Sequence, residues 1–124
     1  MTPKLYRIFN VAKRLSQKSN HPSHKLGCVI FNKKILIGFG YNQVKTHPKS
    51  KTNYSNIHAE FHSILGVNPS DLRNASAFVY RETVKGTIGM AKPCPICKKL
   101  LFGAGIKEVY YTTQNGSIDK ITQE

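Results

Sequence analysis

The stretch KLGCVIFNKKILIGFGYN, residues 25–42, decides how the chain is organised. It contains two segments rich in β-branched and aromatic residues, KLGCVIF and KILIGFGYN, which are separated by a short polar segment. Apolar runs bounded by turn residues are typical of β-strands. We therefore predict two strands that form an antiparallel hairpin, with a tight turn at Asn32–Lys33.

The segments on either side of this hairpin predict further helices and strands. Before it, apolar residues recur at helical spacing over residues 3–18, with Pro3 at the helix start. After it come a polar basic loop (43–56), a helix (57–65), a strand (75–82), a Gly-containing loop (83–91), a helix from Cys94 to the Gly103/Gly105 pair, a strand (107–113) and a short final strand (117–124). Asn115-Gly116 suits the two left-handed positions of a hairpin turn. This order predicts an α/β fold in which helices cover one mixed, five-stranded sheet.

The size of the chain sets further limits. At 124 residues it is long enough for a single core, and we assign residues 1–124 to one domain. No apolar run approaches the roughly 20 residues that cross a membrane. The N-terminus MTPKLYRIFN lacks the apolar core of a secretory signal. We therefore expect a cytoplasmic protein that has no membrane partner.

The charge balance points to an anionic partner. The chain carries 19 Lys and Arg against 6 Asp and Glu, which gives a net charge of +13. A surplus of this size in a small domain indicates binding of a nucleotide or a polynucleotide. A solvated lysine-rich surface is the alternative, because composition alone does not separate the two.

The three cysteines divide into one core residue and one pair. Their odd number argues against a disulfide framework in an intracellular chain. Cys28 lies inside an apolar strand and is predicted to belong to the core. Cys94 and Cys97 form a C-x2-C pair, which is typical of metal or redox sites.

Polar side chains interrupt two helix-like stretches, NIHAEFHSIL (56–65) and KPCPICKKLL (92–101). We expect Asn56 to cap the first helix and Pro93 or Pro95 to lie in the first turn of the second. Both groups of polar residues therefore open a helix, where the helix dipole favours a thiolate.

His58, Cys94 and Cys97 together offer one nitrogen and two sulfur ligands, a set that suits Zn2+. Structural zinc sites usually have four protein ligands, whereas catalytic sites keep one position for water. Glu60 is predicted to reach that water and to move its proton. Each residue has an ordinary alternative, namely a capping histidine, a structural zinc pair or a solvated carboxylate. The combination H-x-E…P-C-x2-C is the known signature of zinc deaminases, and it favours the catalytic interpretation.

These motifs, the hairpin at 25–42 and AKPCPICKKLLFGAGIKEVYYTT (91–113) make the chain resemble the cytidine and deoxycytidylate deaminase superfamily over residues 3–113. The resemblance implies a three-layer α/β/α cytidine-deaminase-like fold and hydrolytic removal of a nucleobase amino group. The chain looks most like small, phage-like deoxycytidylate deaminases. A zinc cofactor, a zinc-activated water with Glu60 as proton shuttle, and association into homo-oligomers are implied on the same grounds.

The resemblance also implies substrate contacts. Asn42 in GYN matches the residue that contacts the sugar, and backbone at Ala59 and around Lys92 matches groups that hold the base edge. The chain reads GYNQ where deoxycytidylate deaminases usually read GYNG, and the loop before H-A-E contains His47 but no cysteine. A second zinc site and feedback control by nucleotides are therefore not implied.

The basic loop VKTHPKSKTNY (44–54) is predicted to lie at the pocket mouth, where Lys45 and His47 would contact substrate. A solvated basic loop is the alternative. One phosphate needs one or two cations, whereas a polynucleotide needs a stripe of cations with aromatic side chains for stacking. His62 is expected to pack rather than to bind metal, and the sequence assigns no role to His21 or His24.

Three functions are consistent with the sequence. The first is zinc-dependent hydrolytic deamination of a cytosine nucleotide, most simply dCMP to dUMP. The second is deamination of cytosine or adenine in single-stranded DNA or RNA, which the charge favours. The third is a non-catalytic zinc-stabilised binding module, in which Glu60 would be dispensable.

Overall fold

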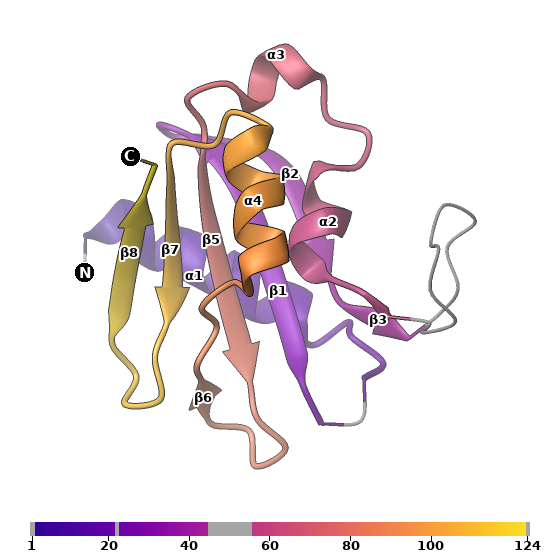
Figure 1. The fold of residues 1–124 in the computed structure, drawn as a ribbon. Coiled ribbons are helices and arrows are strands. Elements are labelled where there is room, and N and C mark those ends of the chain that lie inside the picture. The colour runs from indigo at the N-terminus through magenta and orange to yellow at the C-terminus, as the bar shows by residue number, and fades with distance from the viewer. Residues whose placement is uncertain (1, 22, 45–55, 124) are drawn as a thin grey trace.

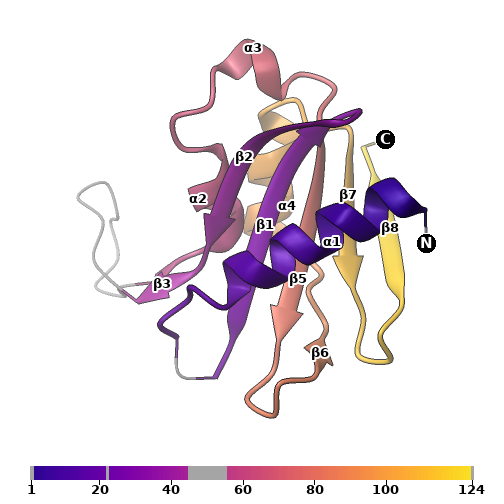
Figure 2. The ribbon, with the colours of Figure 1, turned by 180° about the vertical axis from the view of Figure 1, so that it is seen from behind.

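The computed structural model describes residues 2–21, 23–44 and 56–123, which form a sheet between two helical layers. The elements in chain order are α1 (Pro3–Ser16), β1 (Lys25–Asn32), β2 (Ile35–Tyr41), β3 (Gln43–Val44), β4 (Asn56–Ile57), α2 (Ala59–Ile64), α3 (Pro69–Leu72), β5 (Ser76–Glu82), β6 (Ile88–Gly89), α4 (Pro95–Gly103), β7 (Glu108–Thr112) and β8 (Ile118–Thr122). Figure 1 shows α2 and α4 on the front of the sheet, and Figure 2 shows α1 running across its back. The predicted α/β/α fold is confirmed.

The sheet has the strand order β2-β1-β5-β7-β8. Among the described strands, only β5 and β7 pair in parallel, because the chain between them crosses the front face through α4, as parallel neighbours require. The five predicted strands are all present. The expected loop at 83–91 also contains β6, which pairs with the end of β5 and makes the sheet six-stranded.

The two faces of the sheet bury separate cores, because successive side chains along a strand point to opposite faces. The front core includes Cys28, Ile30, Ala77 and Val79, and the back core includes Val29, Phe31, Phe78 and Tyr80. Cys28 is fully buried, so the prediction that it belongs to the core is confirmed.

The first helix begins where its sequence predicts. The Thr2 hydroxyl accepts the N–H of Leu5 at 3.1 Å, and Pro3 fills the first turn, where a missing N–H costs nothing. Ile8 and Ala12 are buried against the back of the sheet. No helix in the described ranges, α1 included, is long and apolar enough to cross a membrane.

Both hairpin turns differ in detail from the prediction. The first turn lies at Lys33–Lys34, one residue late, and Lys33 takes the left-handed conformation with φ of 55°. In the second turn only Gly116 is left-handed, with φ of 82°, and Asn115 is not. The hairpin is closed by the N–H of Thr113, which donates to the carbonyl of Ser117 at 2.9 Å. This is the hairpin class in which a single left-handed glycine ends the loop.

The start of α2 also differs from the prediction. Asn56 belongs to β4, so the expected Asn56 cap is wrong, and His58 is the N-cap. The helix ends at Ile64, one residue before the predicted end, because Leu65 is already extended. The elements that the sequence missed, α3, β3, β4 and β6, have only two to four residues each, which is too short to show a period.

Two glycines allow α2 to lie directly on β2. A Cβ on Gly40 would be 2.4 Å from the carbonyl oxygen of Ala59 and 2.4 Å from the amide nitrogen of Ser63. A Cβ on Gly38 would be 2.4 Å from the carbonyl oxygen of Ser63. The helix backbone therefore rests on the strand backbone, and this contact fixes the first turn of α2, which carries Glu60.

We predict that Gly40→Ala lowers the free energy of unfolding by about 1–3 kcal/mol, the usual cost of overpacking a core. The added methyl group would meet backbone atoms, which cannot rotate away. Gly103→Ala is the matched control, because a Cβ there meets nothing within 4 Å, and its change should stay within about 1 kcal/mol. Denaturant unfolding of the two zinc-loaded variants measures the difference. Equal stability of Gly40→Ala and the wild type would contradict the close approach.

Candidate metal centre and active site

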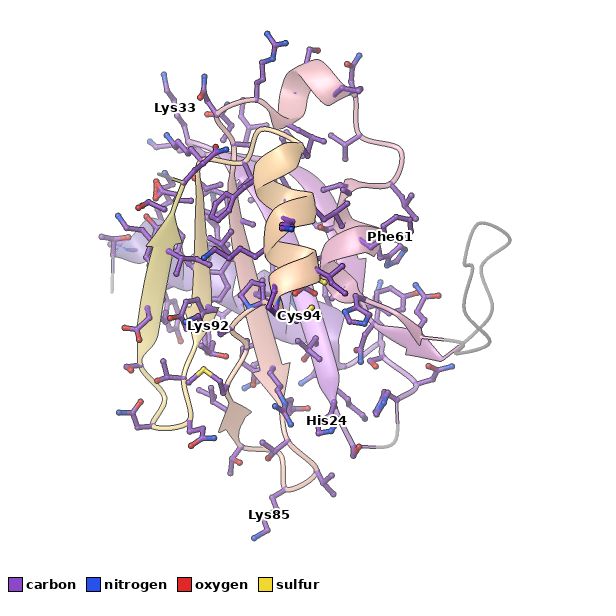
Figure 3. The ribbon with its side chains drawn as sticks, viewed as in Figure 1. His24, Lys33, Phe61, Lys85, Lys92 and Cys94 are labelled. Carbon is purple, nitrogen blue, oxygen red and sulfur yellow. The ribbon has the colours of Figure 1, made fainter. Side chains whose placement is uncertain are left out.

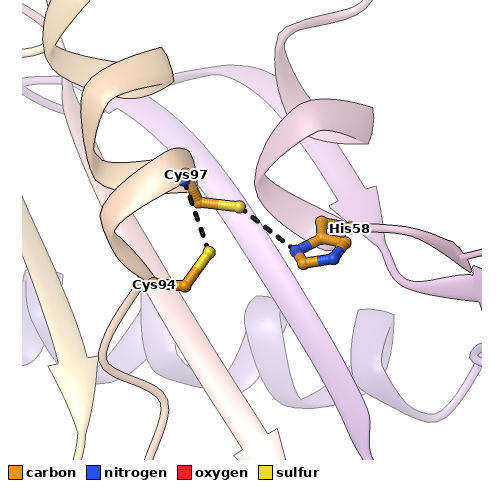
Figure 4. Close-up of side chains that lie close together, drawn as sticks. All are labelled: His58, Cys94 and Cys97. Carbon is orange, nitrogen blue, oxygen red and sulfur yellow. Dashed lines mark hydrogen bonds between the residues drawn. The ribbon is translucent and has the colours of Figure 1, made fainter. Parts of the chain in front are cut away.

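The starts of α2 and α4 meet in front of the sheet (Figure 4). His58 is the N-cap of α2, Cys94 is the N-cap of α4, and Cys97 lies in the first turn of α4. The Nδ1 atom of His58 is 3.2 Å from the Sγ atom of Cys97. The ligand atoms of the three side chains all lie within 4.8 Å of one another. The structure thus brings together the three residues that the sequence predicted as metal ligands.

Local sequence explains how α4 presents its two sulfur atoms. Pro95 occupies the first helical position, and the Sγ atom of Cys94 accepts the N–H of Cys97 at 3.5 Å, in place of the usual oxygen cap. Residues three apart lie on one side of a helical turn. Cys94 is exposed and Cys97 is buried, so the sulfur atoms lie at the rim and in the interior of one site.

The donor set fits zinc. Tetrahedral zinc binds sulfur at about 2.3 Å and imidazole nitrogen at about 2.0–2.1 Å, so its ligand atoms lie roughly 3.5–4 Å apart. The observed cluster is close to that spacing. It is also the one group of three or more His, Cys, Asp or Glu suited to a metal within the described part of the chain. Three protein ligands leave a fourth tetrahedral position for water or substrate.

Glu60 is a buried carboxyl group beside this cluster. It lies in the first turn of α2 and is only 4% exposed. Burial raises the pKa of its carboxyl group, while its own backbone N–H, the charge of His58 and a hydrogen bond with Cys97 act in the opposite direction. A buried carboxyl group that contacts metal-site residues is suited to proton transfer at that site.

The protonation of Cys97 depends on whether a metal is bound. Burial raises the pKa of the Cys97 thiol, and the nearby Glu60 carboxylate raises it further. A coordinated zinc ion stabilises the thiolate instead, because its charge outweighs these effects. Metal binding at this site therefore releases protons and is weaker at low pH.

A pocket of about 280 Å³ opens beside the metal centre. Its wall includes the site residues His58, Glu60 and Cys94 and three of the predicted substrate-binding residues, Asn42, Ala59 and Lys92. Figure 3 shows Lys92 and Cys94 near the lower end of α4. Lys45 and His47, the other two predicted contacts, lie outside the described residues.

Asn42 connects the ends of two strands. Its Oδ1 atom accepts the N–H of Leu26 at 2.8 Å, and its Nδ2 atom donates to the carbonyl of His24 at 2.6 Å. Asn42 therefore holds the segment that enters β1 against the end of β2. Its contact with the sugar of a substrate stays a prediction.

His62 packs against β2, as the sequence predicted. Its Nδ1 atom accepts the N–H of Tyr41 at 3.0 Å, and the two rings meet edge to face with 4.9 Å between their centres. The side chain of Gln43 also contacts the His62 ring, at 3.1 Å from Nδ1. His62 is not part of the three-donor cluster.

Besides apolar lining residues, sequence reasoning missed three polar residues of the pocket wall, His21, His24 and Arg81. The two histidines precede β1, and Arg81 lies near the end of β5. One signal was available for Arg81, because it is a charged side chain that follows the apolar run SAFVY. Nothing in the sequence indicates that the histidines and this arginine meet.

The sequence matches a known protein family over most of its length. Residues 3–113 match the family described as the cytidine and deoxycytidylate deaminase zinc-binding region. The match covers most of the 124 residues, so the chain belongs to this family. Zinc is therefore the cofactor, in agreement with the donor set of the cluster.

Three relatives illustrate the likeness. The deoxycytidylate deaminase of Mus musculus is 29% identical over 116 residues, which are 82% of this chain and 60% of the mouse protein. The cytidine deaminase of Burkholderia pseudomallei has a TM-score of 0.69 at 20% identity and covers 98% of this chain and 93% of its own. The dCMP deaminase of cyanophage S-TIM5, in complex with dCMP and dUMP, has a TM-score of 0.62 at 19% identity and covers 91% and 84%. The fold is thus shared, and this chain spans about 60% of the length of the mouse relative.

We predict that Cys94→Ala weakens zinc binding more than about 100-fold, because loss of even an outer partner of a ligand costs 10- to 100-fold. It should also lower the melting temperature, since metal binding contributes to folding free energy. The control is Cys28→Ala, which removes a buried thiol outside the donor cluster and should keep zinc. Metal content after dialysis against a weak chelator distinguishes the two. A full complement of zinc in Cys94→Ala would show that the ligand set is wrong.

Proposed function

We propose that the protein is a zinc-dependent deaminase of a cytosine nucleotide, most simply an enzyme that hydrolyses dCMP to dUMP and ammonia. Membership of the deaminase family supports the type of reaction. The substrate is supported by the similarity to the mouse deoxycytidylate deaminase and to the cyanophage enzyme bound to dCMP and dUMP.

The observation that carries the proposal is the position of Glu60. Its carboxyl group is buried in the wall of the same pocket as the donor cluster and interacts with His58 and Cys97. A zinc site that only stabilises the fold gains nothing from a buried ionisable group, which costs free energy to remove from water. A hydrolytic site does gain, because a carboxyl group next to the reacting atoms can accept a proton and return it.

In this proposal, three residues of the site bind the metal and a fourth transfers protons. His58, Cys94 and Cys97 hold zinc, which when bound supplies a Lewis acid that lowers the pKa of a water molecule. As water adds to C4 of the base, Glu60 takes one of its protons and delivers it to N3. Glu60 then takes the proton of the new C4 hydroxyl and delivers it to the amino group, which leaves as ammonia. A raised carboxyl pKa suits a group that must both accept and donate.

Other pocket residues orient the nucleotide in this proposal. The backbone at Ala59 and around Lys92 holds the edge of the base, and Asn42 contacts the sugar; all three residues line the pocket. The sequence and its resemblance further support a single domain that forms homo-oligomers and works in the cytoplasm.

We predict that the zinc-loaded protein converts dCMP to dUMP. Glu60→Gln should lower turnover by about 100- to 10,000-fold, the usual contribution of a general acid–base group. Zinc content should stay unchanged, because Glu60 is not among the three donors. Asp71→Asn is the matched control, since it removes an exposed carboxylate on α3 and should leave turnover as it is. Chromatography of dUMP and an ammonia assay measure both variants.

A parallel assay with a cytosine-containing single-stranded DNA at moderate salt tests the substrate class. We expect turnover of dCMP alone. Turnover of the DNA alone would replace our proposal by a polynucleotide deaminase. Zinc-loaded protein that is inactive on both, or Glu60→Gln with full activity, would refute the assigned chemistry.

A further inference from the structure

Three pocket residues that the proposed chemistry does not use form a basic cluster. His21, His24 and Arg81 line the same pocket as Glu60 and Cys94. The Nη2 atom of Arg81 donates a hydrogen bond to Nδ1 of His24, and the rings of His21 and His24 lie 5.3 Å apart between their centres. We call His21, His24 and Arg81 the His–Arg corner.

Hydrogen bonds determine which atoms of the corner can still donate. Nδ1 of His21 accepts the backbone N–H groups of Ser23 at 3.2 Å and of His24 at 3.0 Å. Nδ1 of His24 accepts from Arg81, because a guanidinium group has donors only. Each imidazole therefore carries its proton on Nε2, which is a hydrogen-bond donor. Arg81 adds a permanent positive charge, and its buried Nε has no hydrogen-bond partner among the residues that the structure describes.

The surroundings of the corner favour an anion. Glu60 is the single carboxylate among the described residues that line the pocket. His24 is exposed overall, but partial desolvation of its ring, the Arg81 guanidinium and His21 together lower its pKa, as expected where positive groups lie close together. Asn42 braces the corner by donating to the carbonyl of His24 at 2.6 Å. N–H donors that are fixed in position around a guanidinium group bind phosphate strongly.

We propose that the His–Arg corner binds the 5′-phosphate of the substrate and selects a nucleoside monophosphate over both the nucleoside and a nucleic-acid strand. This inference rests on the proposed deaminase function and assigns the residues that choose its substrate. Figure 3 shows His24 well below Cys94, near the lower end of the sheet, so a nucleotide with its base at the metal centre extends toward the corner. A terminal phosphate carries up to two negative charges, whereas each link of a strand carries one. The pocket, at about 280 Å³, is at the small end of ligand sites and suits one nucleotide.

The test compares ligands with and without the phosphate. For the zinc-loaded wild type we expect kcat/KM for dCMP to exceed that for deoxycytidine by about 10- to 100-fold, the usual effect of hydrogen bonds to a charged group. Arg81→Gln should remove this preference, chiefly by raising KM for dCMP. Arg81→Lys keeps the positive charge but lacks the planar guanidinium group with its paired donors, so it should retain part of the preference for dCMP.

Two further variants keep the test independent of folding defects. His24→Gln changes an exposed side chain and should reduce the preference for dCMP about 2- to 10-fold, as expected for one hydrogen bond. Lys85→Gln also removes one positive charge, but Lys85 is exposed at the tip between β5 and β6, away from the pocket (Figure 3). It should leave the preference unchanged, which separates a local contact from an effect of net charge.

Binding measurements separate the corner from the chemistry. Calorimetry with dUMP and deoxyuridine should show the same preference in the wild type and its loss in Arg81→Gln. A phosphate preference that is absent in the wild type or survives Arg81→Gln would overturn the corner while leaving the deaminase proposal intact. Turnover of single-stranded DNA as efficient as that of dCMP would also overturn it. If the protein deaminates none of these substrates but binds dUMP more tightly than deoxyuridine, and Arg81→Gln removes that preference, the deaminase function is refuted and the corner is supported. If it neither deaminates them nor prefers dUMP, both proposals are refuted.

Discussion

The backbone of α2 lies on β2 with no side chain between them, because Gly38 and Gly40 face the helix. Any larger residue at these positions would push the helix away from the sheet and shift its first turn. That turn carries Glu60, and His58 caps it, so the contact with the strand sets where both side chains lie. The parallel pairing of β5 with β7 positions α4 in the same way, because the chain must cross the front face to reach β7. The metal centre forms where these two independently placed helix starts meet.

The metal centre and the adjoining pocket each gather ionisable groups whose charges a ligand would balance. Glu60 and the Cys97 thiol are buried next to each other, and burial raises the pKa of both. Zinc supplies the positive charge that makes a thiolate and a carboxylate compatible in so small a volume. Glu60 is the single carboxylate among the described residues that line the pocket, so a substrate phosphate would provide the opposite charge for Arg81 and the two imidazoles. Some of the net charge of +13 thus has a specific place in the site, with Arg81 and Lys92 in the pocket wall.

Features with local signals could be predicted from the sequence. The first helix has its threonine cap and its proline, and the long strands alternate or run apolar, so their positions follow from propensity and period. The metal ligands were also accessible, since H-x-E and P-C-x2-C encode side chains at helix starts. Asn56 failed as a cap because residues 56 and 57 pair with 43 and 44 in a small second sheet, and this pairing outweighs the capping preference.

The His–Arg corner could not be predicted, because it depends on the register between distant strands. Leu26 of β1 lies opposite Arg81 of β5, and this register brings Arg81 to the segment that contains His24, 57 residues earlier in the chain. A shift of register by one residue would turn the Arg81 side chain to the other face of the sheet. Lys45 and His47, which the sequence predicted as substrate contacts, lie outside the described residues.

The most direct test of the whole account is a crystal structure of zinc-loaded Glu60→Gln with dCMP bound. We expect zinc at about 2.0–2.1 Å from His58 and about 2.3 Å from the sulfur atoms of Cys94 and Cys97. We also expect C4 of the base next to the metal, and phosphate oxygens within hydrogen-bond distance of Arg81. Zinc bound by other residues, or a nucleotide with its base remote from Gln at position 60, would contradict it.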